Sequence, residues 1–496
     1  MKKIILGILV GLMVMNMFCF GKETKKEKVA YKKLSFNMEN FVENLTPVQM
    51  ERDIDMLEYY IKNCYVNYDL IEKGKYFDFD AALSRLREEC SQSTGMQRKE
   101  FTECIGRNLY GWPDSHVGLS LFYRSAPPFQ MPVLSHFDYY STGIVVKKAG
   151  NGYTVVSSEE PSVLKGWVYQ SEGHDLFPLY TAGKTEQLFR IGTLSDKQTA
   201  QMQLVFSDAD NVKKTETVPV SMAPLRNIPA SASPLTIQQT DSQAYIRLTT
   251  LDDLVNQDPA VQKSLDSFVA YASEAKKKSL LVIDVRGNGG GDDDYVFRFF
   301  SGLCGNKIES NIGETDLWSP GIVQSWQFMQ DYFLSDKKNI PDAMVYEIKK
   351  IQKIAKKMKK KPVRYYEING KMKKRDIKKL LEGYKGKIIL IMDRITASSA
   401  ETFVELLKGA GNVVILGENS CGLIATGNRF LYFLPYSKCC INLPCSRHAA
   451  ACSLPHGLDD GMGYSPDYWV SSDEELYGDL RGMGVDPVLL EKIKDE

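Results

Sequence analysis

The stretch KIILIMDRITASSAETFVELLKGAG, residues 387–411, predicts a buried strand that turns directly into a helix. Residues 387–392 form an apolar run of strand length. After this run, apolar side chains recur at helical spacing, at Phe403, Leu406 and Leu407. The Gly-Ala-Gly sequence at 409–411 marks the end of the helix. Ser398 and Ser399 lie at the turn between the two elements, where a serine can cap the helix or act as a nucleophile.

Strands and helices alternate on both sides of this stretch, which predicts an α/β domain. The pattern predicts strands at 244–248, 279–285, 388–393 and 412–417, and helices at 261–275, 294–303 and 398–408. We expect this core to span residues 235–475, with a C-terminal tail at 476–496 and a basic insertion at 306–384. The insertion carries an apolar stripe, which includes Ile354 and Met358, among many lysines. It could attract anionic surfaces, but we favour an amphipathic insertion packed on the core.

Two further regions precede the core. Residues 22–135 are expected to form an N-terminal helical region, with helical periodicity from Thr46 to Tyr110. After His116 the sequence changes to short runs typical of strands, which predicts a β domain at 136–222. A stretch rich in Pro, Ala and Ser, residues 222–234, is predicted to link this domain to the core.

The first residues predict export. Met1-Lys2-Lys3 is a charged start, residues 4–20 are almost wholly apolar, and Gly21 offers a small residue for cleavage. This pattern is typical of a secretory signal peptide at 1–21, although an uncleaved membrane anchor remains an alternative. No later stretch is long and apolar enough to span a bilayer. We therefore expect a mature protein without a membrane span in the periplasm, in the cell envelope or outside the cell.

Composition excludes some function classes. Lys+Arg and Asp+Glu both number 62, and this zero net charge argues against a nucleic-acid-binding protein. All of the ten cysteines except Cys19 follow the predicted cleavage site, which leaves an odd number. Several cysteines lie between Cys421 and Cys452, where they could form local disulfides or act as small buried hydrophobic residues. Their spacing does not match paired metal-binding dyads, so we expect no metal site.

A second stretch, LVIDVRGNGGG at residues 281–291, predicts a buried strand that ends in a charged pair and a glycine run. Glycines let the backbone approach a ligand closely, although an ordinary tight turn explains them equally simply. A phosphate-binding loop is disfavoured because no Gly-Lys-Ser/Thr sequence follows. Asp292, Asp293 and Asp294 lack the ligand spacing of a calcium loop.

Together the two stretches resemble the tail-specific, or C-terminal processing, serine peptidases. The first similarity is a strand followed by Asp-x-Arg-x-Asn-Gly-Gly-Gly, at 284–291. The second is a serine at a strand-to-helix turn three residues before a glutamate, here Ser398 and Glu401. The resemblance implies an α/β fold with a crotonase-like ββα superhelix core, an N-terminal helical region and a PDZ-like β domain. It also implies a peptide or protein substrate.

One departure from the family pattern concerns the catalytic base. Many members place a lysine after a glycine downstream of the serine, but here Gly422 is followed by Leu423, which excludes a Ser-Lys dyad at that position. The pair Ser115 and His116 is similar to the tricorn branch, in which a Ser-His pair from the helical region reaches the nucleophile. Asp460 takes the place of that branch's glutamate, with a shorter side chain.

The resemblance implies Ser398 as nucleophile, His116 as general base, Ser115 and Asp460 as orienting groups, and an oxyanion hole formed by amides of Ser399, Gly289 and Gly290. The reserve base is His456, and the weaker candidates are His136, His174 and His448. The alternative is a catalytically inactive peptide- or ligand-binding protein on a peptidase scaffold. No metal or organic cofactor is implied, and the sequence leaves the oligomeric state open.

Overall fold

The computed structural model describes residues 41–71, 77–112, 114, 116–121, 129–132, 137–170, 175–183, 186–222, 233–252, 259–308, 314–326, 349, 352–357, 364–369, 381–423, 425–448 and 463–495. The predicted signal peptide at 1–21 and most of the predicted linker lie outside these ranges. Within them, no helix has both the length and the hydropathy needed to cross a bilayer.

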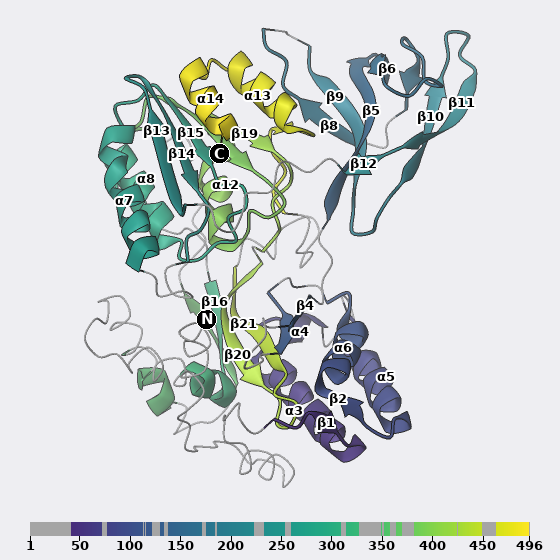
Figure 1. Ribbon diagram of the computed structural model, residues 1–496, viewed down its shortest axis with the longest axis vertical. Coiled ribbons are helices and arrows are strands. Elements are labelled where there is room, and N and C mark those ends of the chain that lie inside the picture. The colour runs from purple at the N-terminus through teal and green to yellow at the C-terminus, as the bar shows by residue number, and fades with distance from the viewer. Residues whose placement is uncertain are drawn as a thin grey trace. The chain divides into compact units, whose positions relative to one another are not determined.

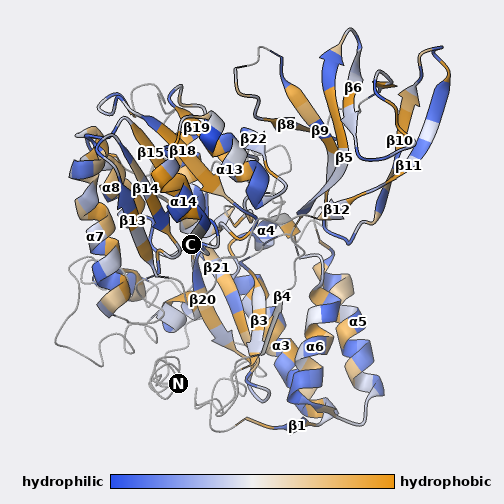
Figure 2. Cartoon of the chain, turned by 45° about the horizontal axis from the view of Figure 1, so that its top comes forward, coloured by the Kyte–Doolittle hydropathy of each residue, from blue (hydrophilic) through white to orange (hydrophobic). Residues whose placement is uncertain are grey.

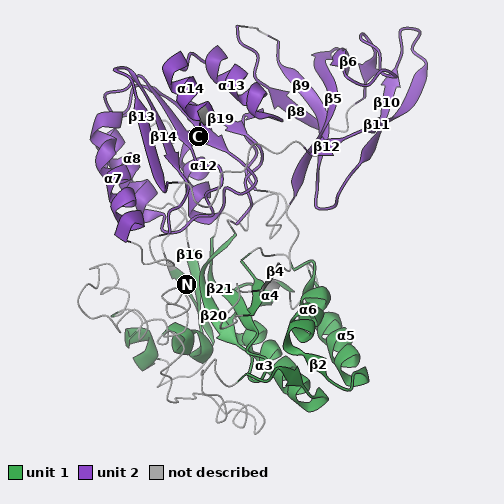
Figure 3. Cartoon of the chain, viewed as in Figure 1, with its two compact units in different colours: residues 1–135, 311–373, 424–460 green, residues 136–310, 374–423, 461–496 purple. Residues whose placement is uncertain are grey.

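The chain folds into two compact units, and each unit is built from three separate stretches (Figure 3). Unit 1 comprises residues 1–135, 311–373 and 424–460, and unit 2 comprises residues 136–310, 374–423 and 461–496. Most of the basic insertion and the stretch after residue 423 therefore belong with the N-terminal residues. The core that the sequence predicts as one interval contributes to both units.

Unit 2 contains a six-stranded sheet in the order β13-β14-β15-β18-β19-β22. All neighbouring strands from β14 to β22 are parallel, and β13 pairs antiparallel with β14. The bounds are β13 Leu235–Gln239, β14 Gln243–Leu248, β15 Leu280–Asp284, β18 Lys387–Met392, β19 Val413–Gly417 and β22 Tyr468–Trp469. The strands predicted from the apolar runs are confirmed, and their continuous hydrophobicity is typical of parallel strands buried on both faces.

Helices cover both faces of this sheet (Figure 1). One face packs against α7 (Pro259–Ala275), α8 (Asp294–Cys304) and α12 (Glu401–Leu407), and the other against α13 (Asp473–Gly482) and α14 (Pro487–Asp495). Successive residues of β15 point to opposite faces: Ile283 packs in the cluster of Phe268, and Val282 in that of Leu480. Strands β15 and β18 accordingly carry the apolar colour in Figure 2. This layering confirms the α/β prediction.

The predicted β domain is an eight-stranded antiparallel sheet in the order β11-β10-β7-β6-β5-β9-β8, with β12 paired to β5. The bounds are β5 Asp138–Ala149, β6 Gly152–Ser158, β7 Val168–Tyr169, β8 Leu176–Leu179, β9 Leu188–Ser195, β10 Gln201–Ser207, β11 Lys213–Pro219 and β12 Ser221–Met222. Ile144, Ile191 and Phe206 are buried in its own small core. The described part of residues 137–222 contains no helix, and the likeness to a PDZ domain stays a prediction.

Unit 1 begins with the helices that the periodicity predicts. They are α3 (Pro47–Cys64), α4 (Tyr68–Ile71), α5 (Phe79–Gln92) and α6 (Arg98–Leu109), with a short strand pair β1 (Asn44–Leu45) and β2 (Met96–Gln97). The first helix starts where the sequence dictates, because the Thr46 side chain accepts from the Gln49 amide and the Gln49 side chain accepts from the Thr46 amide. Pro47 follows at the first helical position, where its missing N–H costs nothing.

A second six-stranded sheet, wholly antiparallel, completes unit 1. Its order is β17-β16-β21-β3-β4, with β20 paired to β21. The bounds are β3 Gly118–Leu121, β4 Phe129–Pro132, β16 Glu314–Trp318, β17 Tyr365–Asn369, β20 Thr426–Phe433 and β21 Cys440–His448. Strands β16 and β17 come from the predicted insertion. Ile354 and Ala355 of the insertion are buried in the core of unit 1, whereas Lys353 and Lys356 are exposed. The described part of the apolar stripe thus packs on the core of unit 1.

Candidate active site

Two loops that follow neighbouring strands of unit 2 form the candidate site. Strands β15 and β18 are parallel and paired, so their carboxyl ends lie at one edge of the sheet, where α/β proteins commonly bind ligands. The glycine run follows β15, and the turn with Ser398 follows β18. The Ala397 amide donates to the Asn288 carbonyl oxygen at 2.9 Å, which joins the two loops directly.

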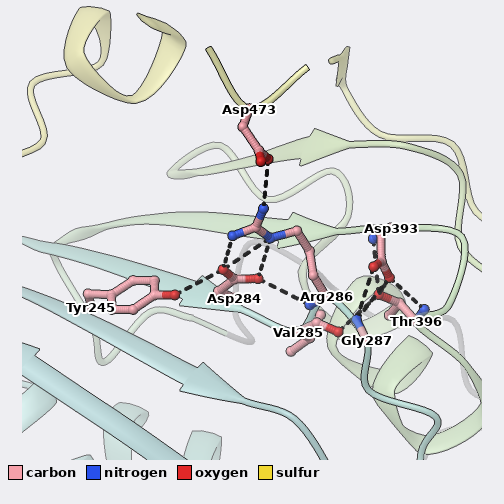
Figure 4. Close-up of polar contacts among 8 residues, drawn as sticks. All are labelled: Tyr245, Asp284, Val285, Arg286, Gly287, Asp393, Thr396 and Asp473. Atoms are coloured by element: carbon pink, nitrogen blue, oxygen red, sulfur yellow. Dashed lines mark hydrogen bonds and ion pairs between the residues drawn. The ribbon is translucent and has the colours of Figure 1, made fainter. Parts of the chain in front are cut away.

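A buried ion pair fixes the start of the glycine loop (Figure 4). Arg286 Nη2 lies 2.7 Å from Asp284 Oδ2, and Arg286 Nε donates to Asp284 Oδ1 at 3.0 Å. Tyr245 Oη donates to the same carboxylate at 3.0 Å, and Arg286 Nη1 lies 3.5 Å from Asp473 Oδ1. Because every charged group here is paired, the strand end is held rigidly although it is almost fully buried.

A second carboxylate ties the two loops together (Figure 4). Asp393 accepts from the Gly287 amide at 3.0 Å and from the Thr396 amide at 2.9 Å. Thr396 Oγ1 in turn donates to the Val285 carbonyl oxygen at 3.0 Å. Burial raises the pKa of Asp393, and the donors from Gly287 and Thr396 oppose that shift. The sequence analysis did not single out Asp393 or Thr396, although their position after a buried strand was a usable signal.

Ser398 adopts a left-handed backbone conformation, with φ of +52°. A non-glycine residue in this region costs free energy, about 1–3 kcal/mol, and such residues gather at functional sites. The Ser398 amide donates to Glu401 Oε2 at 2.9 Å, and the side chain remains partly exposed. A plain helix cap would adopt extended backbone angles and accept a bond from the helix. Ser398 forms no such cap bond, so its conformation favours the nucleophile interpretation.

Glu401 is the fully buried anchor of this turn. Besides the Ser398 amide, it accepts from the Gly422 amide at 2.9 Å, the Leu423 amide at 2.9 Å and Ser420 Oγ at 2.5 Å. Burial raises the pKa of Glu401 to about 7, and the four donors counteract that rise. The segment where the family pattern places a lysine therefore serves here, through its backbone, to hold Glu401 and with it Ser398.

The glycine loop passes directly in front of Ser398. A Cβ atom on Gly290 would lie 2.8 Å from Ser398 Cβ and 2.8 Å from the Ala397 carbonyl oxygen. Gly290 also has φ of +96°, so both space and backbone angles require glycine. Gly289, in contrast, is exposed, and a Cβ atom there would meet nothing within 4 Å.

The amides expected to form an oxyanion hole differ in their availability. The sequence predicts Gly290 as a donor, but its amide donates to Asn288 Oδ1 at 2.9 Å. That interaction fixes the loop and takes the Gly290 amide away from a substrate. Ser399 lies in the first turn of the helix, where amides commonly lack intrahelical partners, and its side chain donates to the Gly291 carbonyl oxygen at 2.7 Å. The amides of Ser399 and Gly289 remain the candidates.

His116 lies in unit 1, where it is almost fully buried. Its Nδ1 is 3.0 Å from Thr426 Oγ1, and Thr426 Oγ1 donates to Asp114 Oδ1 at 2.9 Å. The His116 amide donates to Asp114 Oδ1 at 3.0 Å, and Tyr65 Oη donates to Asp114 Oδ2 at 2.9 Å. The sequence analysis missed Asp114 and Thr426. Asp114 lies two residues before His116 and could have been noticed, but Thr426 carries no local signal.

Burial shifts both titratable groups of this network towards their neutral forms. It lowers the pKa of His116 to about 3, with further lowering by the positive charges of Arg429 and His448. It raises the pKa of Asp114 to about 6, although Thr426 and Tyr65 donate to the carboxylate. At neutral pH the imidazole is therefore uncharged, which a general base requires.

Ser115 and Asp460 lie outside the described residues, as do the alternative histidines His136, His174 and His456. His448 is in β21, where burial lowers its pKa. Among the described residues, no three His, Cys, Asp or Glu side chains gather in a cluster that could hold a metal ion. The eight described cysteines are all buried.

Residues 242–436 match the model of peptidase family S41. This segment, which is less than half of the chain, is similar to family S41 peptidases. It contains both motifs on which the resemblance was based, the glycine loop after β15 and Ser398 with Glu401. The predicted resemblance to a peptidase family is thereby confirmed for this segment. Among curated proteins, no relative matches the chain.

Several solved structures match the chain at low identity and with TM-scores below 0.5. Mature CPAF in complex with lactacystin is 13% identical, with a TM-score of 0.44 over 90% of this chain and 98% of that one. The photosystem II D1 C-terminal processing protease is 14% identical, with a TM-score of 0.32 over 85% and 92% of the two chains. The tricorn protease is 12% identical, with a TM-score of 0.36 over 90% and 37%.

Proposed function

We propose that this chain is an exported serine endopeptidase, with Ser398 as nucleophile and His116 as general base. The observation that carries the proposal is the conformation of Ser398. Its φ of +52° is held by Glu401, and the neighbouring Gly290 leaves no side chain between the loop and the serine. This arrangement keeps the hydroxyl at a strand-to-helix turn next to helix-terminal amides, which favour negative charge.

The proposed reaction follows the Ser-His pattern of acyl transfer. Ser398 Oγ attacks the carbonyl carbon of a peptide bond while His116 takes the hydroxyl proton, and the amides of Ser399 and Gly289 stabilise the oxyanion. His116 then delivers the proton to the leaving amine, which leaves an acyl group on Ser398. Water attacks that ester with the same base, and the enzyme is regenerated.

This mechanism assigns His116 as the base for Ser398. Ser115 and Asp460 stay in the proposal as groups that orient the site, as the tricorn-like resemblance implies. Gly422 and Leu423 support the choice of a histidine base, because leucine cannot accept a proton and both amides are occupied by Glu401. The crotonase-like core, the PDZ-like domain and the cleavable signal at 1–21 belong to the same proposal.

A fluorophosphonate probe tests the nucleophile, because it labels only activated serines covalently. We expect the purified mature chain to be labelled and the Ser398→Ala variant to remain unlabelled with its fold intact. Ser399→Ala is the matched control, since it keeps its backbone amide and should still be labelled. An unlabelled parent chain, or a label that persists in Ser398→Ala, would contradict the proposal and favour a binding protein on a peptidase scaffold.

A further inference from the structure

We propose that Thr426 and Asp114 fix the tautomer of His116, so that Nδ1 carries the proton and Nε2 is the basic nitrogen. The proposal rests on the proposed function only where it assigns Nε2 a role in catalysis. The state of the imidazole can be tested separately. Thr426 and Asp114 are in this view positioning residues, which act on the reaction through His116.

The contacts form a chain from a carboxylate through a hydroxyl to the imidazole. Asp114 Oδ1 and His116 Nδ1 are 4.0 Å apart, which is too far for a direct hydrogen bond. Thr426 Oγ1 lies between them, 2.9 Å from the carboxylate oxygen and 3.0 Å from the ring nitrogen. The hydroxyl thus relays the influence of the carboxylate to the ring.

The number of protons decides the tautomer. An ionised carboxylate can only accept, and Asp114 already faces three donors: the His116 amide, Thr426 Oγ1 and Tyr65 Oη. A threonine hydroxyl has one proton, so a hydroxyl that donates to Asp114 can only accept from His116. The Nδ1 atom must then be protonated, and in a neutral imidazole this leaves the lone pair on Nε2.

At pH values above the pKa of Asp114, the neighbouring charges favour an ionised Asp114 and a neutral His116. The positive charge of Arg429 favours the ionised carboxylate and opposes a second charge on His116. His448 on the paired strand has its own pKa lowered by burial, so it carries no charge at pH 8. Burial raises the pKa of Asp114 to about 6, so at pH 8 the carboxylate is ionised and the proton count above applies.

The relay differs from the roles that the family resemblance gives to Ser115 and Asp460. It uses a threonine of β20 and an aspartate of the loop before β3, which the chain brings together across 312 positions. Both side chains are buried, as is His116, so water does not compete for these bonds.

The direct test is ¹⁵N NMR of the full-length mature chain labelled at histidine, recorded at pH 8. His116 is assigned by the signal that disappears in His116→Gln. We expect a protonated Nδ1 and an unprotonated Nε2 in the parent chain. A parent spectrum with the proton on Nε2 overturns the proposal, whatever the catalytic activity of the chain.

Thr426→Val removes the hydroxyl and places a methyl group where it stood, which keeps the carboxylate away from the ring. Without an acceptor for the Nδ1 proton, the imidazole should adopt the tautomer that is protonated on Nε2. The rate of peptide hydrolysis should then fall by roughly 10²-fold, which is a typical contribution of a general base to the rate. The fall should appear in kcat rather than in KM. Thr426→Ser restores the hydroxyl and should recover both the tautomer and the rate.

Tyr65→Phe is the matched control, because it takes one donor from Asp114 on the oxygen that does not face Thr426. Its spectrum should keep the parent tautomer at pH 8. If Tyr65→Phe changes the tautomer as Thr426→Val does, or if Thr426→Val leaves it unchanged, the relay is refuted. A spectrum that behaves as expected in a chain that hydrolyses no peptide would instead uphold the relay and refute the proposed function.

Discussion

Glu401 in unit 2 and Asp114 in unit 1 are both buried carboxylates surrounded by donors, but the donors differ in kind. Glu401 receives three backbone amides and one hydroxyl. Asp114 receives two hydroxyls and one backbone amide. The first carboxylate supports the proposed nucleophile, and the second supports the proposed base.

The difference matters because amides and hydroxyls respond differently to change. A backbone amide keeps its proton and its direction, so the three amides bound to Glu401 can only hold the chain in place around Ser398. A hydroxyl can rotate and can both donate and accept, so Asp114 can influence the protonation of His116 through Thr426. One carboxylate is therefore suited to fixing a backbone conformation and the other to directing a proton.

The largest expected effect is a difference in the free energy of unfolding between variants that lack one or the other carboxylate. Glu401→Ala leaves one buried amide and two partly buried amides without this partner, and since a buried unpaired amide costs about 1–3 kcal/mol, the free energy of unfolding should fall by roughly 3 kcal/mol. Asp114→Ala leaves one amide and two hydroxyls that can rotate to other acceptors, so its loss should be smaller. Urea unfolding of both variants measures this, and a greater loss in Asp114→Ala would break the comparison.

The second-largest expected effect is on the rate of peptide hydrolysis, when a side chain is added to the glycine loop that contacts Ser398. Gly290→Val should lower the rate of peptide hydrolysis roughly a hundredfold or more, comparable with the loss of an oxyanion donor. The new side chain would press on Ser398 and Ala397 and would also strain a backbone with φ of +96°. Gly289→Ala is the control, since a Cβ there meets nothing within 4 Å. Equal rates in Gly290→Val and the parent would show that the loop is only a turn.

The pH dependence of stability should also distinguish Glu401 from Asp114. The pKa of Glu401 is raised from 4.5 to about 7, so its contribution to stability is complete below pH 4.5 and is lost as the pH rises towards 7. For Asp114, raised from 3.8 to about 6, the corresponding loss occurs between pH 3.8 and 6. Each pKa unit corresponds to about 1.4 kcal/mol.

The two titration windows can be measured with variants that cannot ionise. The advantage of the parent over Glu401→Gln in unfolding free energy should shrink as the pH rises from 4.5 to 7. The advantage over Asp114→Asn should shrink at lower pH. Differences that grow with pH in these windows would contradict the direction of both shifts.

The smallest expected effect is at Leu423, which binds Glu401 through its backbone amide alone. Leu423→Ala keeps that amide, so the unfolding free energy should change by less than about 1 kcal/mol, as is common away from the core. The peptidase rate should stay close to that of the parent. A large loss of rate would mean that this side chain, and not only its backbone, supports the site.

The sequence predicts most of what is local in this fold and little of what is distant. Strands β15 and β18 and helices α7 and α8 follow from apolar runs and helical spacing, which need only neighbouring residues. The Ser-x-x-Glu pattern also marks Ser398 and Glu401. The φ of Ser398 could not be predicted, because no glycine indicates a left-handed residue there and the conformation depends on bonds to Glu401.

The base and the insertion show why the rest could not be predicted. His116 and Thr426 are 310 residues apart, and no periodicity connects them. The basic insertion was expected to pack on a core, but its strands β16 and β17 join the sheet of unit 1 through β21. Pairing between distant segments depends on the completed fold, which single-sequence patterns do not describe.

The division of unit 1 into three stretches has a consequence for the order of synthesis. Strand β3, which follows His116, pairs with β21, and Thr426 begins β20. A ribosome therefore makes the whole of the 136–310 segment and the Ser398 turn before the last partner of His116 exists. Until residue 426 has been made, the imidazole lacks the hydroxyl of Thr426 as a partner. In the proposed mechanism, the positioned base is thus one of the last features that the nascent protein acquires.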